Sequence, residues 1–150
     1  MSPRILLAAL LLVPLPAAAD CPPGTLTGEV TFVRDGDTIE LGAMAIRLQG
    51  LAAPEGGERG GFEATAAMRD LVLGKVIACE LDGEATYDRC DAICTLEGGA
   101  DISEELVRMG LARDCPRYSG GRYEAAEQEA AAQGATIGET YRVPGYCRPR

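Results

Sequence analysis

Alternating apolar and polar residues in the first half of the chain are typical of short β-strands. The pattern predicts three of them, over Thr25–Val33, Thr38–Leu41 and Met44–Leu48. Asp35-Gly36 and Gly42-Ala43 stand between these runs, and such dipeptides favour tight hairpin turns. We therefore expect an antiparallel three-stranded meander.

Helical periodicity follows in three places. Apolar residues recur at helical spacing over Phe62–Leu73, Ile102–Leu111 and Tyr123–Gln133. Gly74, Gly110 and Gly134 mark the ends of these segments, as glycine commonly does at helix C-termini. The second helix has Asp101 or Ser103 near its start, where a side-chain oxygen can cap free amides.

Strand character returns over Lys75–Leu81 and Ala92–Leu96, which the connection 82–91 separates. Each run carries one cysteine, so we expect a Cys79–Cys94 disulfide between neighbouring antiparallel strands. The element order predicts an α+β fold, a closed five-stranded β-barrel of the oligonucleotide/oligosaccharide-binding (OB) type with three helices packed outside. Such a barrel does not specify its ligand.

Residues 1–19 have the layout of a secretory signal peptide: the lone Arg4, the apolar stretch Ile5–Leu15 and three alanines at 17–19. The apolar stretch is too short to span a bilayer, so we expect cleavage before Asp20 and a mature protein without a membrane span. Residues 20–142 then form one domain, and the Pro- and Gly-containing tail 143–150 lies irregularly on its surface. The periplasm and the external medium are both open as destinations.

An even number of cysteines in an exported chain favours a set of disulfides. The six are Cys21, Cys79, Cys90, Cys94, Cys115 and Cys147. A zinc site is disfavoured, because the chain has no histidine and no pair of Cys-x-x-Cys motifs. We therefore expect three disulfides. The lack of histidine also excludes a Ser-His or Cys-His nucleophile.

The charge balance works against nucleic acid as a ligand. The chain has 14 Lys and Arg against 23 Asp and Glu, and loss of Arg4 with the signal peptide brings the net charge from −9 to −10. An acidic surface repels polyphosphates at long range. Salt screens that repulsion, however, so a local positive pocket can still bind a phosphodiester.

Three short motifs together carry a family resemblance. They are Asp35-Gly36-Asp37-Thr38, Ile46-Arg47-Leu48 and Ala52-Ala53-Pro54-Glu55. Their order and spacing resemble the signature of the thermonuclease-like (staphylococcal nuclease homologue) family, which reads Asp-Gly-Asp-Thr, Ile-Arg-Leu and Asp-Ala-Pro-Glu. The segment Asp101–Ala112 is similar to that family's helix ending in Leu-Val-Arg-x-Gly-Leu-Ala. The resemblance extends over about Leu26–Ile137.

The resemblance implies calcium-assisted hydrolysis of DNA and RNA phosphodiesters. Asp37 matches the first metal carboxylate, Arg47 a phosphate-binding guanidinium, and Glu55 the general base. Ala52, however, stands where the family has its second metal-binding aspartate, and Ala53 stands at a position that contributes a backbone carbonyl. A site with Asp37 as its sole carboxylate should hold Ca²⁺ weakly, unless Glu58 or Asp91 approaches the metal.

The second arginine of the family lies in a motif resembling Asp-x-Tyr-Gly-Arg before the fifth strand. Aligned from Asp88 without a gap, that arginine becomes Ala92, and aligned on the strand it is deleted. Arg89 is nearby and could substitute for it. The alternative is that Arg89 is a solvent-facing residue of the connection.

Three hypotheses follow. In the first, an exported thermonuclease-like protein keeps part of the phosphate site, is a poor or inactive nuclease, and binds nucleic acid or nucleotides weakly. The second is a weak calcium-dependent phosphodiesterase using Asp37, Arg47 and Glu55. The third is an envelope barrel that binds a protein or a glycan, and the sequence predicts no particular protein partner. The segment Arg113–Tyr123 could cradle an anion or stack a base, or simply be a disulfide-pinned connection.

Overall fold

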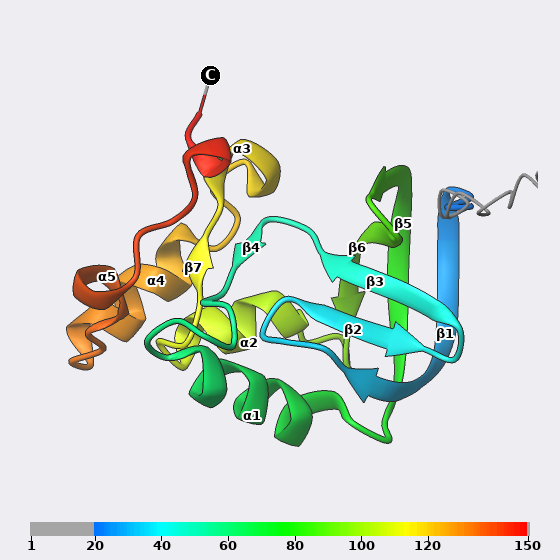
Figure 1. Ribbon diagram of the computed structural model, residues 1–150, viewed down its shortest axis with the longest axis horizontal. Coiled ribbons are helices and arrows are strands. Elements are labelled where there is room, and N and C mark those ends of the chain that lie inside the picture. Colours follow the sequence, from blue (N-terminus) through cyan, green and yellow to red (C-terminus); the bar gives the residue numbers. More distant parts are fainter. Residues whose placement is uncertain (1–19, 150) are drawn as a thin grey trace, which may run out of the picture.

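The computed structural model describes residues 20–149 and contains a closed β-barrel with helices around it (Figure 1). The predicted signal peptide lies outside the described residues. The barrel strands are β1 (Gly24–Val33), β2 (Thr38–Leu41), β3 (Met44–Leu48), β5 (Val76–Thr86) and β6 (Arg89–Thr95). Their order around the barrel is β1-β2-β3-β6-β5. The expected five-stranded α+β barrel is therefore confirmed.

The predicted meander is present, because β1, β2 and β3 pair antiparallel in sequence order. A bulge between Val30 and Phe32 bends β1, so that it pairs with β2 at one end and with β5 at the other. Parallel pairing of β3 with β6 closes the barrel. This closure leaves no edge between β3 and β6 and brings residues 47–48 beside residues 91–92.

The β5–β6 hairpin is longer than predicted, and the expected connection 82–91 is wrong. β5 continues to Thr86 and β6 begins at Arg89, so Tyr87 and Asp88 alone form the turn. The end of this hairpin projects beyond the core, and most of residues 82–86 are exposed on both faces. Because no face there is buried, the apolar alternation that marks a strand disappears from the sequence.

The three predicted helices are present as α1 (Gly61–Val72), α2 (Ile102–Arg108) and α4 (Glu124–Ala132). α2 ends before the predicted Leu111, because Gly110 adopts a left-handed conformation with φ of 72°. The structure adds the two-stranded ladder of β4 (Leu51–Ala52) and β7 (Arg113–Asp114), and also α3 (Pro116–Ser119), α5 (Ile137–Thr140) and the 3₁₀ helix η1 (Gly145–Cys147). In Figure 1, α3, α4 and α5 gather on the side of the molecule away from β1.

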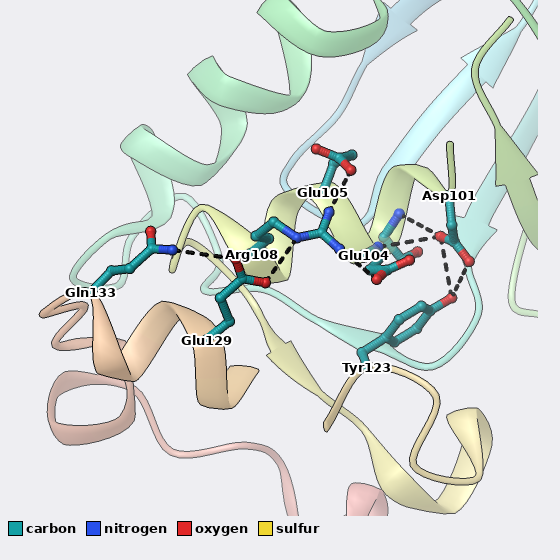
Figure 2. Close-up of polar contacts among 8 residues, drawn as sticks. Asp101, Glu104, Glu105, Arg108, Tyr123, Glu129 and Gln133 are labelled. Atoms are coloured by element: carbon teal, nitrogen blue, oxygen red, sulfur yellow. Dashed lines mark hydrogen bonds and ion pairs between the residues drawn. The ribbon is translucent and has the colours of Figure 1, made fainter. Parts of the chain in front are cut away.

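Polar contacts join α2 to the C-terminal half of the domain (Figure 2). Asp101 caps α2 by accepting from the Ser103 and Glu104 amides, and it also accepts from the buried Tyr123 hydroxyl at 3.1 Å. Arg108 reaches one carboxylate on α4, that of Glu129, at 3.3 Å. These contacts, with the packing of α2 on α4, fix the region that leads into β7.

Three disulfides confirm the prediction made from the cysteine count. They join Cys21 to Cys90, Cys79 to Cys94, and Cys115 to Cys147. The Cys79–Cys94 pair was expected, and these two residues face each other directly in the β5–β6 ladder. Cys115–Cys147 ties the C-terminal tail to the residue before α3. Within residues 20–149 no helix is both long and apolar enough to cross a membrane.

Candidate functional site

The turn between β1 and β2 is built to deliver Asp37 into the interior. The Asp35 carboxylate accepts a hydrogen bond from the Asp37 amide at 2.9 Å, a local turn that aspartate favours. Gly36 packs so tightly that an added Cβ would lie 2.7 Å from the Ala53 Cβ. The turn therefore lies directly against the segment that leads from β4 to Glu55.

Asp37 organises two guanidiniums. Only 4% of Asp37 is exposed, and one of its oxygens lies 2.9 Å from Arg47 Nη2. Its other oxygen accepts the Thr38 hydroxyl proton at 2.8 Å, and the Thr38 oxygen accepts from Arg89 Nη1 at 3.2 Å. One buried carboxylate thus holds Arg47 directly and Arg89 through a hydroxyl.

Burial sets the protonation behaviour of this pair. Burial raises the pKa of Asp37 to about 7, against the opposing attraction of Arg47. Burial lowers the pKa of Arg47 and is the largest single cause, but the combined attraction of Asp37 and the other nearby acidic groups outweighs it, so that pKa is raised. We assign the pair as ionised from the 2.9 Å contact, which has the length of a charge-assisted hydrogen bond.

A cavity of about 430 Å³ opens above these groups, between the tip of the β5–β6 hairpin and the α3 and η1 segments. Arg47, Glu55 and Arg89 all line it. The structure therefore brings together the candidate general base and both candidate phosphate-binding residues. Asp37 lies behind Arg47 and is not part of the cavity wall.

Arg89 is a partly buried residue of a strand, not a solvent-facing residue of a connection. It is the first residue of β6, pairs with Ala45 of β3, and donates from Nε to the Thr86 carbonyl at 3.3 Å. The missed signal is the tripeptide Tyr87-Asp88-Arg89, which fits the Tyr-Gly-Arg of the family motif. The alignment from Asp88 began the motif too late, and the alignment on the strand set the start of β6 at Ala92 rather than Arg89.

The donor set does not fit calcium. Ala52 is 1% exposed and packs with Cys115, Tyr141 and Cys147 in a small apolar cluster. The Ala53 carbonyl, the expected metal ligand, accepts the Tyr141 hydroxyl proton at 3.1 Å. Ca²⁺ takes six to eight oxygen ligands. In the described part of the chain, no three His, Cys, Asp or Glu side chains lie close enough together to hold a metal ion.

Neither of the two other acidic candidates rebuilds a metal site. Glu58 accepts from the Glu55 amide at 2.8 Å and so stabilises the loop that presents Glu55. Asp91 lines the cavity and accepts from Thr86 Oγ1 at 2.9 Å. Its second oxygen is buried and has no partner among the described residues, and burial raises the pKa of this carboxyl.

Two tyrosines complete the cavity wall: Tyr118, from the segment 113–123 that the sequence offered as an anion- or base-binding candidate, and Tyr146, which the sequence did not single out. Tyr118 lies in α3 and Tyr146 in η1, and their rings meet edge to face with centroids 6.4 Å apart. Arg47 Nη2 donates to the Tyr146 hydroxyl at 3.4 Å. The tail reaches the site because Cys147 is bonded to Cys115. The Cys115–Cys147 pairing was the only feature that could have placed Tyr146 at the site, and the sequence alone did not assign that pairing.

Comparison with known proteins gives one family and several similar chains. The profile of the family described as "Staphylococcal nuclease homologue" matches residues 45–138. The succinoglycan biosynthesis protein ExoI of Rhizobium meliloti (strain 1021) is 32% identical over 142 residues, covering 87% of this chain and 72% of that protein. An uncharacterized endonuclease of Haemophilus influenzae is 29% identical over 137 residues, covering 87% and 76%. One of Escherichia coli is 34% identical over 96 residues, covering 61% and 63%.

Proposed function

The chain belongs to the staphylococcal nuclease homologue family, and on that premise we propose that it is an exported member that binds phosphorylated ligands but hydrolyses phosphodiesters poorly or not at all. One observation carries the proposal. The Ala53 carbonyl is hydrogen-bonded to Tyr141 beside the apolar Ala52, where the family would bind its metal.

Phosphate binding is supported by two guanidiniums that line one cavity and share one carboxylate. Planar guanidinium groups offer paired N–H donors that match phosphate oxygens. Because Asp37 and Thr38 hold Arg47 and Arg89 in place, little side-chain freedom is lost when an anion binds. The acidic surface disfavours long polynucleotides, so short nucleic acids or nucleotides are the ligands that we expect to bind, and weakly.

Poor hydrolysis is supported by the lack, within residues 20–149, of a fitting site for a metal ion, whose positive charge the reaction would use. A metal ion stabilises the charge that develops on phosphate oxygens in the transition state, which contributes several kcal/mol. The two guanidiniums supply part of that stabilisation, whereas Glu55, an anion, supplies none. In this chain they can hold a phosphate and orient a water beside it.

The alternative is a weak calcium-dependent phosphodiesterase acting on DNA or RNA. Its support is that Glu55, Arg47 and Arg89 line the same cavity, so these groups of the family site are all present. A second alternative is a barrel that binds a glycan or a protein, and one relative is named for the biosynthesis of a polysaccharide.

A cleavage assay separates these functions. Purified residues 20–150 are incubated at low salt with single-stranded DNA and with RNA, in calcium, in other divalent cations and in chelator. Glu55→Ala, which keeps the backbone of the 55–58 loop, is the matched control. We expect no hydrolysis above this control. Hydrolysis that both the chelator and the substitution abolish would establish the phosphodiesterase instead.

Export is the remaining part of the proposal. Its support is the layout of residues 1–19 together with three disulfides, which form in oxidising compartments. N-terminal sequencing of the protein recovered from the periplasm and from the medium should give Asp20 as the first residue. A cytoplasmic protein that retains Met1 would contradict export.

A further inference from the structure

Tyr146 is held at the cavity by a covalent tether. It directly precedes Cys147, which is fully buried and bonded to the equally buried Cys115. Tyr146 itself is 48% exposed, and its ring rests edge-on against Tyr118. The tail therefore cannot carry Tyr146 away from the cavity without breaking a buried disulfide.

The Tyr146 hydroxyl accepts a hydrogen bond within the protein but donates none among the described residues. A phenol has one proton to donate and lone pairs that accept. The Tyr146 oxygen accepts from Arg47 Nη2 at 3.4 Å, while its own proton finds no acceptor within residues 20–149. The hydroxyl is thus polarised by a cation and keeps its proton available for a ligand in the cavity.

The two arginines also keep free donors. Arg47 engages Asp37 and Tyr146 through Nη2 alone, which leaves Nε and Nη1 without hydrogen-bond partners in the described chain. Arg89 uses Nε and Nη1, which leaves Nη2. Arg47, Arg89 and Tyr146 therefore each bring an unused donor to one cavity. Tyr87 and Tyr118 also line it, but among the tyrosine hydroxyls of residues 20–149 only that of Tyr146 accepts a hydrogen bond from an arginine, which places it beside a guanidinium.

Three donors suit a phosphomonoester better than a phosphodiester. A diester has two non-bridging oxygens and one negative charge, whereas a monoester has three such oxygens and a charge of about −1.5 to −2 at neutral pH. We propose that Tyr146 is a third phosphate-binding residue, and that it makes the cavity selective for terminal phosphate groups over phosphodiesters within a chain. This inference rests on the proposed phosphate-binding function.

The carboxylates in the cavity do not change the expected selectivity of Tyr146. Glu55 and Asp91 also line the cavity and oppose the binding of either ester. A hydroxyl donor carries no net charge, so it distinguishes the two esters by the number of acceptor oxygens rather than by long-range attraction. The effect of Tyr146 therefore shows in the ratio of two affinities.

The test compares phenyl phosphate with methyl phenyl phosphate, a monoester and a diester with the same ring, by titration calorimetry on residues 20–150. Tyr146→Phe removes the hydroxyl and keeps the ring. We expect it to weaken phenyl phosphate about tenfold, as loss of a hydrogen bond to a charged group does, and to leave methyl phenyl phosphate nearly unchanged. Tyr118→Phe removes the other hydroxyl of this ring pair, to which no arginine donates a hydrogen bond within residues 20–149. A change of the ratio there as large as that in Tyr146→Phe would overturn the assignment to Tyr146.

The outcomes separate this inference from the function on which it rests. An equal ratio of affinities in wild type and Tyr146→Phe would overturn the role of Tyr146. If Arg89→Ala still weakens both esters in that case, phosphate binding itself stands. Failure of both esters to bind the wild-type protein would instead overturn the proposed phosphate-binding function, and the inference with it.

Discussion

The guanidinium of Arg47 lies 2.9 Å from the carboxylate of Asp37, a residue that the family resemblance assigns to a metal ion. Through Thr38 the same carboxylate also holds Arg89. In this chain the negative charge of Asp37 is thus balanced by Arg47, and Arg89 is linked to it through the Thr38 hydroxyl. The local result is a pair of positioned guanidiniums that line one cavity, and the proposed anion binding rests on them.

Arg47→Ala should destabilise the fold more than Arg89→Ala. Loss of Arg47 leaves Asp37 buried without a counter-charge, which costs about 3–5 kcal/mol, whereas loss of Arg89 removes two hydrogen bonds worth about 1 kcal/mol each. Urea unfolding of the two variants measures the difference. Asp37→Asn in the Arg47→Ala background should recover most of the loss, and equal losses in the two single variants would contradict the assigned ion pair.

Tyr141→Phe should lower the free energy of unfolding by about 1–3 kcal/mol, because the buried Ala53 carbonyl loses its hydrogen-bond donor. Urea unfolding measures this change as well. Tyr118→Phe, at a half-exposed tyrosine, should stay within about 0.5 kcal/mol of wild type. A Tyr141→Phe protein as stable as the wild type would show that Tyr141 does not hold this carbonyl.

Calcium should leave the melting temperature unchanged. A ligand that binds only the folded state raises stability with the logarithm of its concentration relative to the dissociation constant. Both carboxylate oxygens of Asp37, which would have to bind the ion, already accept hydrogen bonds from Arg47 and Thr38. Scanning calorimetry in millimolar calcium and in chelator measures this. A rise in calcium that disappears in Asp37→Asn would reveal a metal site at this position.

Asp114 should make stability fall as pH rises. Burial raises the pKa of this carboxyl above its ordinary value, and one of its oxygens is buried without a partner among residues 20–149. The folded state therefore favours the protonated form. That contribution is complete below the unfolded pKa of about 3.9 and is lost as pH rises through the higher folded value.

Asp114→Asn provides the check on this contribution. Its free energy of unfolding, measured by urea titration across the acidic range, should fall less with rising pH than that of the wild type. Parallel curves for the two proteins would contradict a raised pKa at Asp114.

The sequence was sufficient for those parts of the site that depend on local motifs. Asp37, Arg47 and Glu55 lie in short segments with fixed spacing, and the structure brings Arg47 and Glu55 to one cavity with Asp37 directly behind. The Cys79–Cys94 bond could be predicted because both residues lie on adjacent strands of one hairpin. These features depend on neighbours that are near in sequence or in strand order.

The remaining parts depend on contacts that no local pattern encodes. Arg89 was misplaced because the exposed hairpin end lacks an apolar alternation, so the start of β6 was set too late. Tyr141 and Tyr146 reach the site across 88 and 99 residues of sequence. Their positions follow from Cys115–Cys147, a pairing that the cysteine count allows but does not select.

The central claim is that guanidiniums, not a metal ion, hold phosphate in this cavity. The most direct test is the dissociation constant of phenyl phosphate, measured by calorimetry on residues 20–150 in chelator and again in calcium. We predict the same value in both, weakened about tenfold or more by Arg89→Ala. Binding that requires calcium, or that Arg89→Ala leaves unchanged, would contradict the claim.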